Sequence, residues 1–402
     1  MEKIQNSCSV TMLKAAEGDC LFLEFHYSSN IFSMLIDTGP MSCWESVLKP
    51  FLDDLCEKGK GIDILVITHF DADHIGGTLR LFTSDKYSGL INQVWFNGPK
   101  QIVPLATSEA TQKDQQAFRI LRSIHEHSMP AVDGPISIPQ AESLTALLER
   151  HCKSVNSFVK GAAITCDTPS MQIAPGFSID FILPNKYGLE ALKSYIQAKT
   201  NRAVRGASMV HTVEGDAAFE SVMLDEESSE DSLESISDTT LDLINIETWA
   251  ACSNSKKDPS ITNMSSIAIC IRFYDYKFLF PGDAAGEDLV ESLTQWSKFH
   301  NEPLNFDVIK MPHHGAFHNC AKLLDVIDGT YFLFSTDGRK YRHPDKETLA
   351  KITQRSPTHP RFLLFNYEND MYQLFHKKSF EERYSYRADI LEKPLKIGGN
   401  NQ

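Results

Sequence analysis

Residues 8–38 alternate between apolar and polar positions in the manner of β-strands. Segments 8–13, 20–25 and 32–37 carry apolar residues at alternate positions or in short runs, and a polar stretch separates the first two. Residues 62–68 form a short apolar run rich in β-branched side chains, which is typical of a buried strand. The pattern therefore predicts a β-meander followed by a further strand.

Predicted helices and strands then alternate through most of the chain. Apolar residues at helical spacing predict helices, whereas short β-branched or aromatic runs predict strands. The predicted helices span 44–58, 78–82, 108–126, 144–151, 287–299 and 346–354. The predicted strands span 94–97, 177–185, 262–273, 276–281, 306–311, 330–335 and 361–366, the last of which ends the predicted core. This alternation is typical of an α/β fold.

The composition fits a protein with a full hydrophobic core. The chain has 402 residues, of which 42% are hydrophobic. No stretch approaches the roughly 18 uninterrupted apolar residues of a membrane span, and the first residues lack a signal-peptide pattern. Nine cysteines without a Cys-x-x-Cys pair indicate reduced thiols. We therefore expect a cytoplasmic protein with no membrane partner.

Residues 188–260 interrupt the regular pattern. Between positions 214 and 247 there are twelve carboxylates and no Lys or Arg, so this stretch contributes −12 of the net charge of −14. Such a composition predicts a solvated, mobile insertion. It is either a plain surface insertion or an acidic segment that covers the site or docks a basic protein partner. Because the rest of the chain is close to neutral, the net charge says little about any cleft.

The most informative chemistry follows the predicted strand 62–68. Four potential metal ligands occur there within six residues: His69, Asp71, Asp73 and His74. The carboxyl end of a buried strand is where open α/β folds place their chemistry. We expect Gly76-Gly77 to turn the chain, so that a helix begins at Thr78. Imidazoles together with carboxylates favour zinc, iron or manganese, and the stretch predicts a metal site.

This stretch resembles the His-x-His-x-Asp-His signature of the metallo-β-lactamase fold superfamily, with Asp71 at the second His position. The following Ile-Gly-Gly makes it most similar to the hydrolase domain of bacterial DNA-uptake (competence) channel proteins and their stand-alone relatives. The resemblance implies a single domain over 1–402, folded as a four-layer αββα sandwich. It covers most of the chain except the acidic insertion at 188–260.

Further motifs extend the resemblance. Asn263 with Ser266, followed by Gly-Asp at Asp283, is similar to the family's fourth motif, in which the Asp bridges two metals. Two consecutive histidines before a glycine are similar to the fifth motif; it implies His314 as a ligand and His313 as its neighbour. We place Asn263 and His313 close to the ligands or the substrate.

Other residues are expected to support the site. Asp37, after the third predicted strand, resembles the carboxylate that braces the metal loop from behind. His343, before Pro344, resembles the family's closing His-Pro. It is either a substrate-facing acid or oxygen-binding donor, or simply a helix-start residue. We assign catalytic roles to Asp73 and His343, and a substrate-binding role to Arg342.

The implied site holds two divalent ions, zinc or manganese, about 3.5–4 Å apart, bridged by Asp283 and a water that acts as nucleophile. His69 and Asp71 would bind the first ion; the second would be bound by Asp73, His74 and His314. Two features depart from the family. Asp71 replaces an imidazole, and the only His between 160 and 262, His211, gives no clear match to the third-motif ligand. An oxygen-rich site shifts the preference from zinc towards manganese.

The fold hosts several hydrolytic reactions, so it does not choose the substrate. The resemblance to DNA-uptake hydrolases favours phosphodiester cleavage in nucleic acid or nucleotides, and Arg339-Lys340 with Arg342 would hold a phosphate. One alternative is hydrolysis of a small ester, lactone or thioester. The other is a non-catalytic interaction module that uses the acidic insertion.

Overall fold

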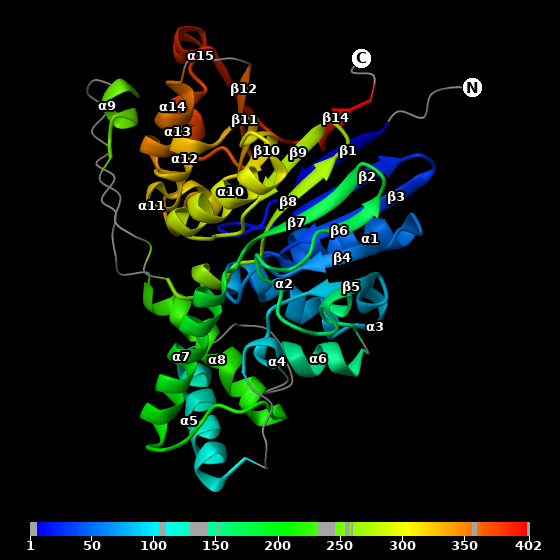
Figure 1. The fold of residues 1–402 in the computed structure, drawn as a ribbon, viewed down its shortest axis with the longest axis vertical. Helices are drawn as coiled ribbons and strands as arrows, with labels where there is room; N and C mark the ends of the chain where they lie inside the picture. The colour runs from blue at the N-terminus through cyan, green and yellow to red at the C-terminus, as the bar shows by residue number, and fades with distance from the viewer. Residues whose placement is uncertain are drawn as a thin grey trace.

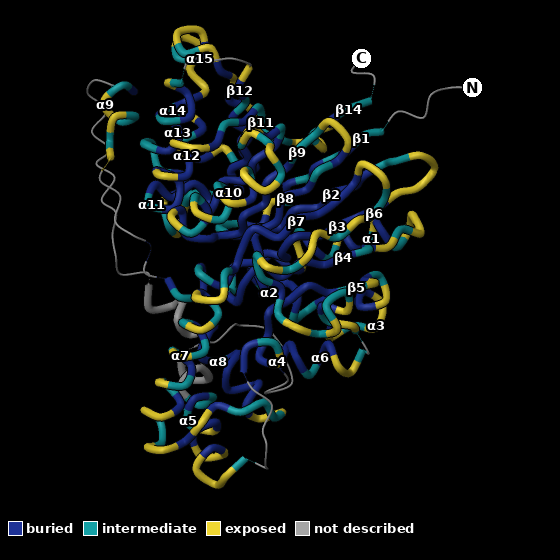
Figure 2. Tube along the Cα trace, in the orientation of Figure 1, coloured by how far each residue is buried: buried dark blue, intermediate teal, exposed yellow. Residues whose placement is uncertain are grey.

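Two β-sheets pack face to face in the structure, a computed structural model. It describes residues 6–103, 110–128, 143–151, 153–230, 246–253, 258, 260–355 and 360–399. The core between the sheets is made of apolar side chains from both, including Val10, Phe25, Phe181, Phe278 and Val308. Central strands such as those at 62–66, 177–183 and 268–273 are buried along most of their length, whereas the edge strands are partly exposed (Figure 2).

The first sheet has six strands in the order β14-β1-β2-β3-β4-β5. The first three strands in sequence pair antiparallel, whereas β3, β4 and β5 are parallel. A C-terminal strand, β14, pairs antiparallel with β1 and completes the sheet. The strands are β1 (Ser7–Met12), β2 (Leu21–Tyr27), β3 (Asn30–Ile36), β4 (Ile62–Val66), β5 (Ile91–Trp95) and β14 (Leu395–Gly398).

The second sheet has eight strands in the order β13-β12-β11-β10-β9-β8-β7-β6. They are β6 (Met171–Ala174), β7 (Phe177–Leu183), β8 (Ala268–Phe273), β9 (Tyr276–Phe280), β10 (Asn305–Lys310), β11 (Asp328–Phe334), β12 (Arg361–Phe365) and β13 (Tyr386–Ile390). Strands β9 to β13 are parallel. The expectation that the core ends near residue 366 is wrong, because β13 and β14 extend one sheet each.

Helices cover the outer faces of both sheets (Figure 1). On the first sheet these are α1 (Lys49–Glu57), α2 (Ala72–Phe82), α3 (Asp85–Ser88), α4 (Pro99–Ile102) and α6 (Leu144–Arg150). On the second sheet they are α10 (Gly286–His300), α11 (Phe317–Cys320), α12 (Leu323–Val326), α13 (Lys346–Thr353), α14 (Asp370–Phe375) and α15 (Lys378–Tyr384). The predicted α/β fold with an αββα layering is confirmed. No helix of the described residues is long and apolar enough to cross a membrane.

Short irregular helices complete the layers. A π-helix (Trp44–Leu48) precedes α1, and the 3-10 helices are η1 (Met41–Cys43), η3 (Ser157–Val159), η4 (Asn263–Ser265) and η5 (Pro312–Gly315). Two of them, η4 and η5, carry residues that the sequence assigned to the site. Asn263 lies in one such short helix, and His313 and His314 have non-helical backbone dihedral angles within the other.

Helix α2 begins at Ala72 rather than at Thr78, so Gly76 and Gly77 lie within it and do not turn the chain. A Cβ on Gly76 would come within 2.4 Å of the Met41 nitrogen, and one on Gly77 within 2.4 Å of the Thr38 oxygen. The glycines therefore allow α2 to lie directly against the loop after β3. The consequence for the site is that Asp73 and His74 stand in the first turn of a helix.

The prediction that residues 188–260 form an irregular loop is also wrong for the part of this segment that the structure describes. Helices α7 (Lys186–Ala203) and α8 (Val213–Glu230) pack with α5 (Gln112–Ser128) in a helical lobe below the first sheet (Figure 1). A shorter helix, α9 (Ile246–Ala250), follows. Apolar residues at helical spacing, such as Leu192 and Ile196, are buried in the lobe. The acidic residues 231–245 lie outside the described residues, so the mobility of that part stays a prediction.

Phe219 of α8 joins the helical lobe to the metal loop. It is fully buried, and its ring lies 5.2 Å from that of Phe70, the residue after His69. The neighbouring Glu220 carboxylate accepts hydrogen bonds from the backbone N–H groups of Leu144 and Thr145 at the start of α6. Burial raises the pKa of Glu220 to about 7. The acidic stretch thus contributes packed structure at its N-terminal end.

We expect Phe219→Ala to lower the free energy of unfolding by about 3–5 kcal/mol, the usual cost of truncating a buried aromatic side chain. Urea denaturation measures it. Phe299→Ala is the matched control, because Phe299 is 85% exposed and its loss should change stability little. If both substitutions lowered the free energy of unfolding by the same small amount, α8 would not be packed structure but a solvated segment.

Candidate metal centre

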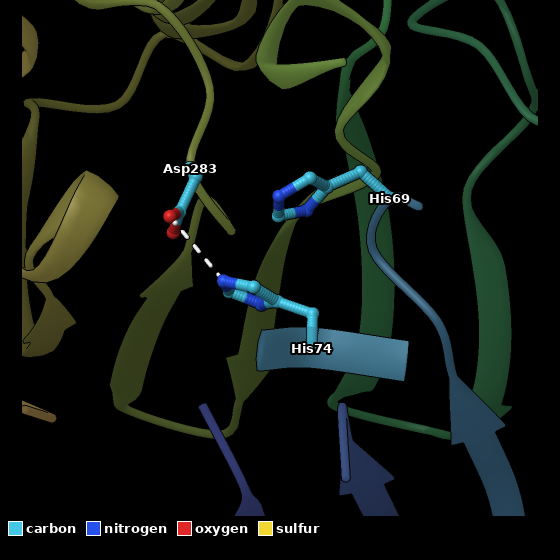
Figure 3. Close-up of side chains that lie close together, drawn as sticks. All are labelled: His69, His74 and Asp283. Carbon is cyan, nitrogen blue, oxygen red and sulfur yellow. Dashed lines mark ion pairs between the residues drawn. The ribbon is translucent and has the colours of Figure 1, made fainter. Parts of the chain in front are cut away.

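The residues that the sequence assigned to metal binding meet at one edge of the two sheets. His69 follows β4, Asp283 follows β9 and His314 follows β10. One ligand atom from each of His69, His74 and Asp283 lies within 4.8 Å of the others, and the same holds for Asp73, His74 and His314. Figure 3 shows the rings of His69 and His74 directed towards Asp283. Three chain segments that are far apart in sequence therefore supply a single cluster.

Each imidazole of the cluster is fixed through its Nδ1 atom. His69 Nδ1 lies 2.9 Å from the Thr68 hydroxyl, His74 Nδ1 lies 2.8 Å from Asp37 Oδ2, and His314 Nδ1 donates to the Ser335 carbonyl at 2.7 Å. The three Nε2 atoms are buried and have no hydrogen-bond partner. Metal-binding histidines show this arrangement, with one nitrogen oriented by the protein and the other left for the ion. The residues therefore fit a divalent metal.

Asp283 presents one oxygen to the cluster and keeps the other for the protein. Its Oδ1 accepts from the Lys310 ammonium at 2.9 Å and from the His313 backbone N–H at 3.2 Å. Its Oδ2 lies 3.3 Å from Nε2 of both His74 and His314. The donors on Oδ1 fix the carboxylate so that Oδ2 is the atom available to an ion.

Asp71 and Asp73 add two further carboxylates to the cluster, one next to His69 and one next to His314. Asp71 Oδ2 lies 3.2 Å from His69 Nε2, and its Oδ1 is buried without a hydrogen-bond partner. Asp73 Oδ2 lies 3.4 Å from His314 Nε2. All six residues that the sequence named as ligands are thus gathered in one place. The geometry places Asp71 next to His69 and Asp73 next to His314.

Asp37 lies behind the metal loop, where the sequence placed it. Its carboxylate accepts from the Thr68 backbone N–H at 2.8 Å and from the Thr68 hydroxyl at 2.7 Å, and it holds His74 Nδ1. Asp37 itself adopts a left-handed backbone, with φ 55°. Because one carboxylate fixes both the end of β4 and an imidazole of α2, it sets the position of the loop between them.

Sequence reasoning missed two charged residues of the site, Asp19 and Lys310. Both are 1% exposed, and they form an ion pair in which the Lys310 ammonium lies between Asp19 and Asp283. Burial disfavours its charge, but the two carboxylates hold the pKa of Lys310 above its usual value. A lysine that ends the apolar run 306–311, next to a histidine pair, was the available signal. It looked like an ordinary strand end.

The charges of the site favour bound cations. Five carboxylates, Asp19, Asp37, Asp71, Asp73 and Asp283, contribute −5 and Lys310 contributes +1, which leaves −4 with neutral imidazoles. Although burial opposes it, the charge of Asp283 and Asp19 raises the pKa of His314 to about 10. The carboxylates thus attract positive charge strongly. Two divalent ions would balance the remaining −4.

The third imidazole of the first metal position is not supplied by His211. Its Nδ1 lies 2.8 Å from Asp216 at the start of α8, and His211 joins none of the metal-type clusters among the described residues. The ligand-type side chains that the described residues place with His69 are Asp71, His74 and Asp283. The departure from the family pattern that the sequence indicated persists in the structure.

His313 and Asn263 lie beside the ligands rather than among them. His313 and His314 share a left-handed backbone, with φ 47° and 54°, which directs their two rings to different sides. The Asn263 amide donates to Asp258 Oδ2 at 2.9 Å, while its Oδ1 is buried without a partner. Although burial opposes it, the nearby carboxylates of Asp258 and Asp283 raise the pKa of His313 to about 9. Asp258, also missed from the sequence, thus supports the neighbouring histidine.

His343 and Arg342 lie farther from the ligand cluster. His343 Nδ1 lies 3.2 Å from Asp345 Oδ1, and its ring centroid lies 5.5 Å from that of His313. Arg342 is exposed and has a left-handed backbone, with φ 57°. The structure therefore brings His343 to the side of the centre but leaves Arg342 at the surface next to it.

One family model matches part of the chain. Residues 26–99 match the family model of the Metallo-beta-lactamase superfamily, and this segment contains β3, β4, α2 and the loop with His69. The matched segment and the two-sheet architecture are consistent with a metallo-β-lactamase fold, whose members are mostly metal-dependent hydrolases. No curated protein sequence matches the chain.

Two solved structures resemble the chain at low identity. One is the metallo-beta-lactamase fold protein YhfI from Bacillus subtilis, with 10% identity, a TM-score of 0.37, and coverage of 98% of this chain and 100% of that one. The other is a single-residue mutant of CmlA beta-hydroxylase, with 11% identity and a TM-score of 0.37. The match to the latter covers 97% of this chain and 53% of that one.

We expect Lys310→Met to lower the free energy of unfolding of the metal-free protein by about 3–5 kcal/mol, because it leaves two buried carboxylates without their cation. Added Mn²⁺ should recover more stability in the variant than in the wild type. Thermal unfolding with and without metal measures both effects. Lys322→Met, which removes an exposed ion pair with Glu287, is the control. A loss as small as that of the control would show that Lys310 does not neutralise the site.

Proposed function

We propose that this protein is a metal-dependent hydrolase that cleaves phosphodiesters in nucleic acids or nucleotides. The observation that carries the proposal is the convergence of three buried, unpartnered imidazole Nε2 atoms with the carboxylates of Asp71, Asp73 and Asp283. Buried polar atoms without partners are rare in folded proteins, and at ligand-type side chains they indicate a site for an ion.

The residues divide into two adjacent sets around Asp283. His69 and Asp71 would hold one ion, and Asp73, His74 and His314 would hold the other, with Asp283 shared. When bound, such ions activate a water molecule and polarise the substrate oxygen under attack. The chain itself keeps the ligands in place: Asp37 orients His74, and Lys310 orients Asp283. This preorganisation is the contribution that the protein makes to the chemistry.

Two further features support a phosphodiester substrate. The loop at 69–77 resembles that of DNA-uptake hydrolases, and basic residues, Arg339, Lys340 and Arg342, precede His343 near the centre. Arginine and lysine recognise phosphate groups through charge-assisted hydrogen bonds. The ligand set contains as many carboxylates as imidazoles, which favours manganese over zinc.

We expect the double substitution His69→Ala with Asp73→Ala to remove bound metal and to abolish hydrolysis of a generic phosphodiester, with the fold retained. Elemental analysis and circular dichroism report metal and fold independently. His376→Ala is a control, because His376 lies outside the site and bonds the Ala388 carbonyl. Full metal content in the double variant would contradict the assignment of the ligands.

Metal-free protein reconstituted with Mn²⁺ or Zn²⁺ and assayed on different substrates distinguishes the possible ions and reactions. The proposal predicts turnover of DNA, RNA or a nucleotide phosphodiester, faster with Mn²⁺ than with Zn²⁺. Binding of a polyanionic substrate should weaken steeply with salt, whereas binding of a small neutral ester should not. Turnover confined to lactones, thioesters or carboxylic esters would contradict the proposal.

A further inference from the structure

Three imidazoles outside the ligand set gather beside the metal centre. They are His313 of η5, His318 of α11 and His343 in the loop before α13. The ring centroid of His313 lies 5.4 Å from that of His318 and 5.5 Å from that of His343, and the latter two are 6.4 Å apart. His318 was not identified from the sequence. None of the three belongs to the cluster formed by His69, His74 and Asp283.

His313 is held by a buried hydrogen-bond network on its Nδ1 side. Its Nδ1 lies 3.2 Å from Asn319 Oδ1 and 3.8 Å from Asp258 Oδ2. Asp258 is 4% exposed, and its Oδ2 accepts from the amide groups of Asn319 at 2.8 Å and Asn263 at 2.9 Å. This network fixes the ring, so its Nε2 atom is the one turned away from Asp258.

His343 is held in the same way by a second carboxylate. Its Nδ1 lies 3.2 Å from Asp345 Oδ1, and Asp345 Oδ2 accepts from the Phe317 backbone N–H at 2.7 Å. Since Asp345 precedes α13 and Phe317 begins α11, the contact ties the elements that carry His343 and His318. In both imidazoles Nδ1 is the nitrogen that faces a carboxylate, so Nε2 is the ring nitrogen directed away from it.

The network argues against a third metal ion at Asp258, His313 and His318, although one ligand atom of each lies within 4.8 Å of the others. Asp258 Oδ1 already accepts from the Ser260 backbone N–H at 2.9 Å, and its Oδ2 accepts two amide groups. His313 Nδ1, the nitrogen nearest Asp258, faces the Asn319 carbonyl oxygen. Both Asp258 oxygens and His313 Nδ1 are therefore already engaged in hydrogen bonds within the protein.

The three imidazoles adjoin the metal ligands, and two of them, His313 and His318, are partly exposed. The His313 backbone N–H donates to Asp283 Oδ1, and the His313 ring lies 6.0 Å from that of His314. The His313 side chain is 20% exposed. If one part of a substrate were bound at the metal centre, its adjoining atoms would lie close to the His313 side chain.

We propose that His313, His318 and His343 form a subsite that binds the oxygens of a substrate phosphate beside the metal centre. This inference rests on the proposed function and names the residues that would hold the phosphate of its phosphodiester substrate. Several imidazole N–H donors suit a phosphate, which offers several accepting oxygens, better than a lactone or thioester, which offers one carbonyl oxygen.

The test measures binding of inorganic phosphate to the manganese-loaded protein by calorimetry. We expect His318→Gln and His343→Gln each to weaken phosphate binding by about tenfold, with metal content unchanged. His376→Gln is the matched control and should bind phosphate as the wild type does. In hydrolysis of a generic phosphodiester the two variants should raise KM more than they lower kcat. Circular dichroism verifies the fold of each variant, and either folded variant suffices for the test.

Equal phosphate affinity in the wild type and in the folded variants would overturn the subsite, as would an absence of phosphate binding to the wild type. Loss of one metal equivalent in His318→Gln would also overturn it, by assigning the cluster to an ion. The proposed function fails separately. Phosphate binding that depends on His318 and His343, without turnover of any phosphodiester, would keep the subsite and reject the function. If the wild type turns over a phosphodiester and both variants do so at the same rate, the proposed function would stand and the subsite would be rejected.

Discussion

The structure depends on carboxylates gathered around a single point: Asp19, Asp37, Asp73 and Asp283 are buried, and Asp71 lies partly exposed beside them. Burying so many like charges is unfavourable unless cations accompany them. Lys310 is one such cation, fixed between Asp19 and Asp283. The remaining negative charge, and the three imidazole Nε2 atoms without partners, make two divalent ions the natural complement. In this view the metal centre is part of the folding energetics as well as the chemistry.

The two sheets meet this requirement by bringing their strand ends together. Thr68 contacts Asp37 on one side and, through its carbonyl, the Ile267 backbone N–H of the second sheet on the other. Close approach demands glycine at particular places: a Cβ on Gly18 would lie 1.8 Å from the Asp73 carbonyl oxygen. The ligands are therefore positioned by backbone contacts between the sheets, and not by flexible loops alone.

The sequence predicted much of this arrangement because ligands and strands leave clear local patterns. His69, Asp71, Asp73 and His74 directly follow an apolar run, and most predicted strands lie within a few residues of the observed ones. Prediction from the sequence failed for residues whose structural role depends on a contact with a residue far away in the chain. Gly76 and Gly77 read as a turn because the loop they pack against was not known. Lys310 read as a strand end because its partner, Asp19, lies nearly 300 residues away, and the acidic charge of α8 obscured the apolar face that buries Phe219.

The central claim is that the buried carboxylates and imidazoles form one centre for two divalent ions. Anomalous diffraction from crystals of the manganese-loaded protein tests it most directly. We predict two manganese peaks in each chain, one beside His69 and Asp71 and the other beside Asp73, His74 and His314, with Asp283 between them. A single peak, or a second peak at Asp258 and His318 in place of the His69 position, would contradict the account.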